Sequence, residues 1–197
     1  MGTYISKLKD FEKGLNLKKK GITITVSGKT GVGKTVISKT LAKTFKLKHV
    51  SAGDIFRAEA KRRKLALEEF SKIREPEIDI ELDKRTLELA KKGNVVLNGR
   101  LTGWVAGDNA DIRIWVKAPM RLKAKRVAKR DKLTIKEAKE KIKKRDEYDA
   151  KVYKKLYGID INDTSIYNLI ITNGDIPLEK LKKLVVSKVK KLLGEKR

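Results

Sequence analysis

Cysteine is absent from the 197-residue chain, and histidine occurs once, at His49. Without cysteine the protein has no disulfide, no thiolate zinc site and no thiol nucleophile. One histidine cannot form a Ser-His-Asp triad or a metal centre by itself, so we expect His49 to be an ordinary packing residue. The chemistry of this protein must therefore come from phosphate-binding groups, carboxylates and a bound metal.

Long apolar runs are also missing, although 40% of the residues are hydrophobic. No uncharged stretch approaches the roughly 20 residues that a membrane-spanning helix needs. The N-terminus lacks the apolar core and the small-residue cleavage site of a signal peptide. We therefore expect a cytoplasmic protein without a membrane partner, of a length that suits one domain with a proper core.

Acidic residues are scarce, because 25 Asp and Glu stand against 50 Lys and Arg and leave a net charge of +25. A field of this sign attracts polyanions such as nucleotides and RNA. The lysines, however, are spread through helical patterns, and solvated helix faces have the same composition. Aromatic residues make up only 6% of the chain, which provides few stacking platforms for bases. RNA as a partner therefore stays a hypothesis.

The most informative segment follows a predicted strand at residues 22–27. It reads Gly28-x-x-x-x-Gly33-Lys34-Thr35 and leads into an amphipathic run that ends at Phe45. A strand, this glycine pattern and then a helix are the context of a phosphate-binding P-loop. The glycines let the backbone wrap a phosphate, Lys34 supplies a cation for the terminal phosphates of a nucleoside triphosphate, and the Thr35 hydroxyl ligates Mg²⁺. We therefore predict that the protein binds a nucleotide.

Short apolar strands alternate with longer helical patterns along the rest of the chain. We predict further strands at 49–51, 95–97, 112–116 and 167–171, and helices at 36–45, 53–92, 119–158 and 178–193, with breaks at Pro76 and at 133–134. This alternation is typical of a parallel sheet covered by helices on both faces, which binds ligands beyond the carboxyl ends of its strands. A short helix laid against the body is predicted before the first strand by apolar residues at helical spacing, Tyr4, Leu8, Phe11 and Leu15.

Two of the loops at the strand ends carry an arginine. Arg57 ends the segment Ser51-Ala-Gly-Asp-Ile-Phe-Arg57 after the second strand, and Arg100 lies in Asn98-Gly-Arg-Leu-Thr-Gly103 after the third. Guanidinium is the preferred group for bidentate contacts with phosphate. Surface arginines are common in so basic a chain, but their place at the strand ends favours a second phosphate-bearing substrate that faces the first.

Several short motifs occur in a fixed order along the chain and include the P-loop and both arginine segments. They comprise Gly28 to Thr35, Ser51 to Arg57, Arg85-Thr-Leu-Glu-Leu-Ala90, Val95-Val-Leu-x-Gly-Arg-Leu-x-Gly-Trp104, Lys117-Ala-Pro119, and Tyr157-Gly-Ile-Asp-Ile161 through Tyr167. The set resembles the archaeal type of cytidylate kinase, a family of nucleoside monophosphate kinases. The resemblance implies an α/β P-loop kinase fold with a five-stranded parallel sheet flanked by helices. It also implies a helical monophosphate-binding insertion at about 53–92, a helical lid at about 130–150, one kinase domain over 21–197 with 1–20 as an extension, and a monomer.

The same resemblance implies transfer of the γ-phosphoryl group of ATP to CMP or dCMP with Mg²⁺ as cofactor, and it assigns roles to residues. ATP would be held by the P-loop and two lid arginines, Gly28, Lys29, Thr30, Gly31, Val32, Gly33, Lys34, Thr35, Val36, Arg126 and Arg130. CMP would be held by Ser51, Gly53, Arg57, Arg100 and Asp149, of which Asp149 would accept a hydrogen bond from the cytosine amino group. Catalysis would use Lys34, Arg130 and Arg145, and the metal would bind Thr35 directly and Asp54 and Asn98 through water.

Two positions depart from the family pattern. Asn98 stands where the family has aspartate, so we expect the site to bind Mg²⁺ more weakly. Val152 stands where relatives usually carry an arginine, and the absence of one charge-assisted hydrogen bond costs about 1.5–3 kcal/mol. Lys151 could compensate, although an ammonium lacks the fork of a guanidinium.

Other functions stay open at this point. A kinase for AMP or UMP would share the fold. A carboxylate at Asp149 suits the amine of cytosine and disfavours the carbonyl of uracil, but adenine also carries an amine. A weakened kinase acting as a basic RNA- or ribosome-associated module is favoured by the charge and by both departures, and is disfavoured by the intact P-loop. A GTPase switch lacks an obvious Asn-Lys-x-Asp motif.

Overall fold

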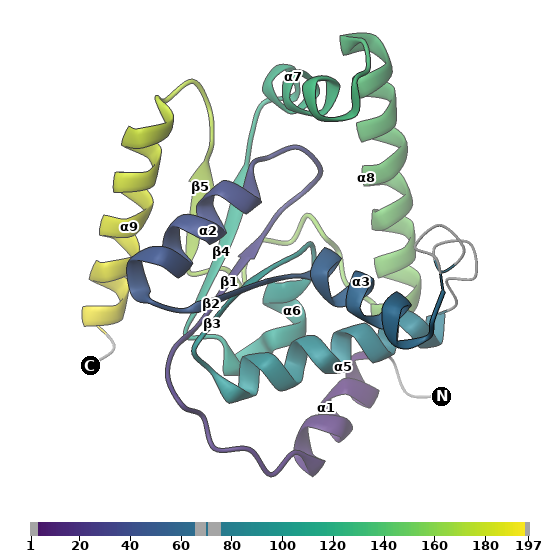
Figure 1. Ribbon diagram of the computed structural model, residues 1–197, viewed down its shortest axis with the longest axis vertical. Helices are drawn as coiled ribbons and strands as arrows, with labels where there is room; N and C mark the ends of the chain where they lie inside the picture. Colours follow the sequence, from purple (N-terminus) through teal and green to yellow (C-terminus); the bar gives the residue numbers. More distant parts are fainter. Residues whose placement is uncertain (1–3, 66–69, 71–75, 196–197) are drawn as a thin grey trace.

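A parallel sheet of five strands forms the centre of the protein (Figure 1). The structure is a computed structural model that describes residues 4–65, 70 and 76–195. The strands are β1 (Thr23–Ser27), β2 (Lys48–Ser51), β3 (Val95–Asn98), β4 (Ile112–Lys117) and β5 (Leu169–Thr172). Their order across the sheet is β2-β3-β1-β4-β5, and every neighbouring pair is parallel. The predicted five-stranded parallel sheet is therefore confirmed.

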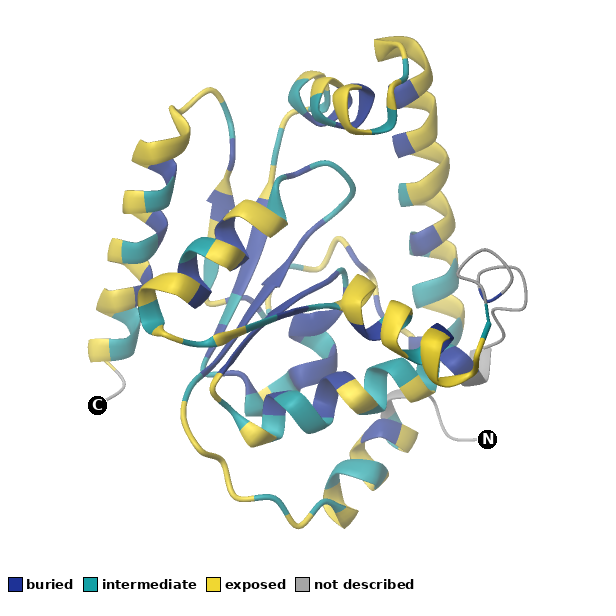
Figure 2. Cartoon of the chain, viewed as in Figure 1, coloured by how far each residue is buried: buried dark blue, intermediate teal, exposed yellow. Residues whose placement is uncertain are grey.

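Helices cover both faces of the sheet, because its strands present apolar side chains in both directions. On one face, α2 (Lys34–Phe45) and α9 (Leu178–Gly194) pack on alternate strand residues such as Val96. On the other face, Val95 and Leu97 of β3 pack with α3 (Ala52–Arg62) and α5 (Pro76–Lys92). Successive side chains of a strand point to opposite faces, which explains this division. Figure 2 shows that the three central strands, β1, β3 and β4, are largely buried while the outer faces of the helices are exposed.

Two helical segments are inserted between strands. α3 and α5 connect β2 to β3, and α7 (Met120–Asp131) and α8 (Ile135–Tyr157) connect β4 to β5 and pack against each other. These segments include the ranges in which the sequence places the monophosphate-binding insertion and the lid. A short helix, α6 (Thr102–Ala106), and a 3-10 turn (Gly107–Asn109) follow β3. Within the described ranges, no helix is both long and apolar enough to cross a membrane.

Local signals explain where several helices begin and end. Pro119 precedes α7, and the Thr134 hydroxyl accepts a hydrogen bond from the backbone N–H of Glu137 in a capping box that starts α8. α8 ends before Gly158, whose φ of 70° favours glycine. α5 begins at Pro76, where the sequence predicts a break, although 71–75 lie outside the described residues.

The expected N-terminal helix is present as α1 (Tyr4–Gly14), which packs against α5. Some details differ from the sequence-based expectation. β5 begins at Leu169, two residues later than predicted, and neither α6 nor the 3-10 turn after it was predicted. α6 has five residues, which is too short to show a helical repeat of apolar positions.

Candidate active site

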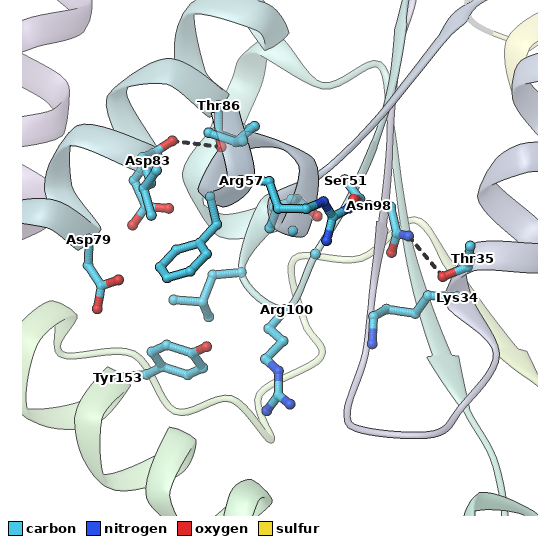
Figure 3. A pocket seen from close by; sticks show the side chains of 18 of the residues that line it. Lys34, Thr35, Ser51, Arg57, Asp79, Asp83, Thr86, Asn98, Arg100 and Tyr153 are labelled. Carbon is cyan, nitrogen blue, oxygen red and sulfur yellow. Dashed lines mark hydrogen bonds between the residues drawn. The ribbon is translucent and has the colours of Figure 1, made fainter. Parts of the chain in front are cut away.

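A cleft of about 470 Å³ lies beyond the carboxyl ends of β1, β2 and β3. Its two ends differ in chemistry (Figure 3). One end is lined by residues that end or follow these strands, including Lys34, Thr35, Ser51, Arg57, Asn98 and Arg100. The other end is lined by side chains of α5 and α8, including Asp79, Asp83, Thr86, Tyr153 and Tyr157. The structure thus brings the P-loop and the two arginines predicted from the sequence into one cavity.

The P-loop turns sharply at its glycines. Gly28 and Gly33 have positive φ values of 151° and 92°, and a Cβ at Gly28 would lie 2.5 Å from the carbonyl oxygen of Val116. Only glycine fits this combination of backbone angle and close approach. The Lys34 ammonium donates hydrogen bonds to the carbonyl oxygens of Gly28 at 2.8 Å and Lys29 at 2.9 Å. Lys34 is therefore held by its own loop.

Burial makes Lys34 a weaker base than an ordinary lysine. It lowers the pKa of the ammonium from 10.5 to about 7; Arg100 contributes in the same direction, and Asp146 opposes the shift. A phosphate beside Lys34 would favour the charged form of the side chain. The protonation state of Lys34 therefore depends on whether an anion is bound.

The other P-loop residues have varied environments. Val32 is buried at the turn, whereas Val36 is exposed on the first turn of α2. Lys29 extends away from Lys34 and donates a hydrogen bond to Oδ1 of Asn162 at 2.6 Å. Gly31 packs so closely on Lys123 of α7 that a Cβ there would lie 3.0 Å from the Lys123 carbonyl oxygen. The loop is therefore in direct contact with the helical segment between β4 and β5.

Thr35 and Asn98 form the most direct candidate for a metal site. The Asn98 amide donates a hydrogen bond to Oγ1 of Thr35 at 3.3 Å, and Asn98 is only 5% exposed. Across the described residues there is no group of three or more His, Cys, Asp or Glu side chains that could hold a metal ion. Mg²⁺ in kinases takes oxygen ligands, usually one or two carboxylates together with nucleotide phosphates, so the Thr35 hydroxyl and the Asn98 amide oxygen supply the right atom type without the usual negative charge.

Asp54, the third predicted metal-site residue, has other partners. It completes a capping box with Ser51 at the start of α3 and pairs with Arg57 at 2.5 Å. The hydrogen bonds from Ser51 are the main cause that lowers the pKa of Asp54 to about 2, with Arg57 acting in the same direction. Gly53 lies on the same helical turn, and a Cβ there would lie 3.4 Å from Nη1 of Arg57. The first turn of α3 thus fixes Arg57 at the edge of the cleft.

Arg100 links the P-loop to α8. Its Nη2 donates a hydrogen bond to Oγ1 of Thr30 at 2.8 Å, and its Nη1 forms an ion pair with Asp149. Arg145 also pairs with Asp149, with 3.2 Å between Nε and Oδ1. The Asp149 side chain is only 4% exposed. The structure therefore groups Arg100, Arg145 and Asp149, and in this state the Asp149 carboxylate binds two guanidinium groups.

Asp146, one turn before Asp149, also joins α8 to the P-loop. Its Oδ1 accepts hydrogen bonds from the backbone N–H of Thr30 at 3.2 Å and the Thr30 hydroxyl at 2.9 Å, and its Oδ2 pairs with Lys123 at 2.7 Å. Burial raises the pKa of Asp146, but the hydrogen bonds from Lys123 and Thr30 together bring it below its ordinary value. Neither Asp146 nor Lys123 was singled out in the sequence, because both sit among many charged helix residues.

The two lid arginines differ in position. Arg126 donates hydrogen bonds to the carbonyl oxygen of Val32 at 3.2 Å and to Oδ1 of Asn173 at 2.9 Å, so it contacts the P-loop. Arg130 instead pairs with Asp131 at 2.7 Å, and its side chain is 62% exposed. Asn173 is buried, directly follows β5 and also donates a hydrogen bond to Val32. Its position after a strand was the signal that could have identified it.

Further cleft residues carry no sequence signal of their own. Asp79, Asp83 and Tyr153 belong to no predicted motif, whereas Thr86 and Tyr157 lie within two of the quoted motifs without an assigned role. Charged residues on an amphipathic helix usually face solvent, so the pattern of α5 alone does not place Asp79 and Asp83 in a cavity.

Comparison with known proteins addresses the family directly. Residues 23–175 match the model of the cytidylate kinase-like family. The chain belongs to this family. A cytidylate kinase of Pyrococcus horikoshii is 52% identical over 160 residues, which cover 80% of this chain and 83% of that protein. A cytidylate kinase of Staphylothermus marinus is 43% identical over 176 residues, which cover 88% of this chain and 99% of that protein.

Solved structures resemble the chain in fold. A shikimate kinase from Bacteroides thetaiotaomicron aligns with a TM-score of 0.59 at 17% identity, covering 88% of this chain and 98% of that one. An uncharacterized protein from Eubacterium ventriosum aligns with a TM-score of 0.67 at 20% identity, covering 86% and 98%. The P-loop kinase fold is confirmed. The names of the relatives support a kinase and do not favour a weakened kinase that acts as an RNA- or ribosome-associated module.

Proposed function

We propose that the protein transfers the γ-phosphoryl group of ATP to CMP or dCMP and releases ADP and CDP or dCDP. The observation that carries this proposal is the shared cleft, in which Arg57 and Arg100 lie in the same cavity as Lys34 and Thr35. Two separate phosphate-binding groups in one cavity suit a reaction between two phosphorylated substrates. The names of the relatives support cytidine as the nucleoside of the acceptor.

In this reaction the P-loop, residues 28–36, holds the ATP phosphates, and Lys34 exchanges its loop carbonyls for phosphate oxygens. Arg57 and Arg100 hold the phosphate of CMP so that one of its oxygens faces the γ-phosphorus. That oxygen forms the new P–O bond while the bond from the γ-phosphorus to the bridging oxygen of ADP breaks. Because this transfer needs little covalent chemistry from the protein, positioning and positive charge supply most of the rate.

Mg²⁺ would bind at Thr35 directly and at Asn98 and Asp54 through water, and it would neutralise charge on the β- and γ-phosphates of ATP. Asn98 supplies an oxygen without negative charge, so the nucleotide must provide most of the ligand charge at this site. Asp54 stays ionised beside Arg57, because its hydrogen bonds from Ser51 hold the pKa low. It can therefore accept hydrogen bonds from water at the edge of the cleft.

Residues of α7 and α8 would close over ATP. Arg126 already contacts the P-loop, and Arg130 lies one helical turn further along α7 and would have to leave Asp131 to reach the triphosphate. Arg145 lines the cleft and would stabilise charge on the transferring group. In this proposal residues 53–92 bind the monophosphate, 130–150 act as the lid, and closure excludes water that would otherwise hydrolyse ATP.

The test measures ADP formation from ATP with CMP, dCMP, UMP and AMP as separate acceptors, and with Lys34→Ala as the inactive control. We expect CMP and dCMP to give the highest kcat/KM, and Lys34→Ala to lose activity by at least about a hundredfold. ADP formation that no monophosphate stimulates would overturn the proposal. Faster turnover with UMP or AMP than with CMP would keep the kinase and reject cytidylate as the substrate.

A further inference from the structure

The end of the cleft that faces away from the P-loop is built from two helices. Asp79, Asp83 and Thr86 lie at positions i, i+4 and i+7 of α5, so they share one helical face, and that face lines the cleft. α8 contributes Tyr153 and Tyr157 to the same end. Figure 3 shows Asp79 and Tyr153 on one side of the cavity and Lys34 on the other, with Arg57 and Arg100 between them.

Neighbouring side chains hold the polar groups of this end in place. The Tyr157 hydroxyl donates a hydrogen bond to Oδ2 of Asp83. The rings of Tyr153 and Tyr157 pack edge to face with their centres 6.1 Å apart. Thr86 is buried, and its hydroxyl donates to the carbonyl oxygen of Leu82 at 3.0 Å. The carboxylates of α5 are therefore presented from a packed helix face beside two aromatic rings.

This arrangement suits a nucleoside monophosphate that lies along the cleft with its phosphate at Arg57 and Arg100. The base then reaches the end formed by α5 and α8, where aromatic rings can stack on it. An ionised carboxylate only accepts hydrogen bonds. The exocyclic amine of cytosine donates them, whereas the carbonyl at the same position of uracil would place its lone pairs against the carboxylate oxygens.

We propose that Asp79 and Asp83 determine the specificity of the kinase by accepting hydrogen bonds from the exocyclic amine of the base, with Tyr157 as a positioning residue for Asp83. The inference rests on the proposed function, because it concerns the same cleft. It differs from the sequence-based expectation that Asp149 binds the cytosine amine. Asp149 is buried and is not among the residues that line the cavity, whereas Asp79 and Asp83 line it.

The test compares kcat/KM for CMP and for UMP in Asp79→Asn and Asp83→Asn. Asparagine keeps the shape of aspartate, but its amide can donate a hydrogen bond to the carbonyl of uracil. We expect each substitution to lower kcat/KM for CMP by about 10- to 100-fold, the effect of one charge-assisted hydrogen bond. The value for UMP should stay constant or rise, and KM for ATP should not change.

Two further variants sharpen this test. Glu88→Gln removes the same charge from the same helix, at a side chain that pairs with Arg85, and should keep the wild-type ratio of CMP to UMP activity. Tyr157→Phe removes only the hydroxyl that holds Asp83. It should raise KM for CMP a few-fold while kcat and KM for ATP stay constant, a split that a general loss of stability would not produce.

The possible results separate this inference from the proposed function. If wild-type protein does not turn over CMP, the proposed function fails. If wild-type protein turns over CMP, and both Asp79→Asn and Asp83→Asn keep the wild-type ratio of kcat/KM for CMP to that for UMP, only the inference is overturned. If this ratio falls in Asp149→Asn and in neither of the other two variants, Asp149 recognises the base. The two aspartates are tested separately, and calorimetric titration with CMP and UMP measures selectivity even in a variant that turns over slowly.

Discussion

The two ends of the cleft are built in different ways. The phosphate end consists of Lys34, Thr35, Arg57, Asn98 and Arg100, which lie at the ends of β1, β2 and β3 or within a few residues after them. The base end consists of Asp79, Asp83, Tyr153 and Tyr157, which come from the facing sides of α5 and α8. The backbone of the sheet thus fixes the phosphate end, whereas the packing of two inserted helices determines the base end.

The two ends also differ in how their charges are balanced. At the phosphate end the cations already have acceptors from the chain, since Arg57 pairs with Asp54, Arg100 pairs with Asp149, and Lys34 donates to its own loop. A substrate phosphate must therefore replace or join internal partners. At the base end the charged groups of α5 are carboxylates, Asp79 and Asp83, and in our proposal they accept hydrogen bonds from the base. We expect the phosphate end to control affinity and rate, and the base end to control the choice of base.

The largest effect that separates the two ends is expected from Asp149→Asn. The change removes the negative charge that orients both Arg100 and Arg145. Because both arginines then lose the carboxylate of Asp149 as an acceptor, kcat/KM should fall by about 10- to 100-fold. The fall should be the same for CMP and UMP, because the phosphate is common to both. Steady-state kinetics with both acceptors measures this, and a fall confined to CMP would place Asp149 at the base end instead.

A smaller effect concerns the pH dependence of ATP binding at the phosphate end. Burial lowers the pKa of Lys34 to about 7 in the free protein, and a bound triphosphate favours the protonated form. Binding above pH 7 therefore takes up a proton, so the Kd for ATP should rise with pH, by at most about tenfold per unit between about pH 7.5 and 9. Calorimetry in two buffers of different ionisation enthalpy measures the proton uptake directly.

Lys34→Arg is the matched control for this titration. Arginine stays protonated across the same range, so its variant should bind ATP without proton uptake, whatever its absolute affinity. A wild-type Kd that stays constant over this range would mean that Lys34 is already charged in the free protein. In that case the hydrogen bonds to the loop carbonyls would be enough to keep the ammonium protonated despite its burial.

The phosphate end could be predicted from the sequence, whereas the base end could not, because the two ends are built in different ways. Gly28 to Thr35, Arg57 and Arg100 belong to short continuous patterns, and the parallel sheet forces the ends of neighbouring strands together. Asp83 and Tyr157, in contrast, are 74 residues apart and meet only because the C-terminal end of α8 packs against α5. On each helix alone such residues read as part of a polar face. No local pattern distinguishes a polar face that lines a cavity from one that faces solvent.

The fold was more predictable than the site, because its signals are local. The runs that became β1, β3 and β4 are short and apolar, and Thr134 and Gly158 mark the ends of α8 by their own conformational preferences. α6 escaped prediction because its five residues are placed by burial against β1 rather than by a repeat. Tertiary packing, which the sequence pattern does not contain, determined the elements and side chains that were missed.

The smallest expected effect tests whether the base end depends on the N-terminal extension. Leu8 of α1 is 5% exposed and packs in a cluster with Leu87, Leu101 and Tyr157. Leu101 and Tyr157 also line the cleft, so Leu8 of α1 packs against side chains that form its wall. Leu8→Ala should destabilise the protein by about 2–3 kcal/mol through the void that it leaves. It should also raise KM for CMP a few-fold, with KM for ATP unchanged.

Lys7→Ala, on the exposed side of the same helix, is the control for Leu8→Ala and should change neither the thermal midpoint nor KM for CMP. A Leu8→Ala variant that is less stable but has the wild-type KM would show that α1 only stabilises the domain. Equal rises in KM for CMP and ATP would mean that the disturbance spreads through the sheet to the phosphate end. A rise confined to CMP would show that the extension supports the base end, because Tyr157 packs in the cluster with Leu8 and also donates a hydrogen bond to Asp83.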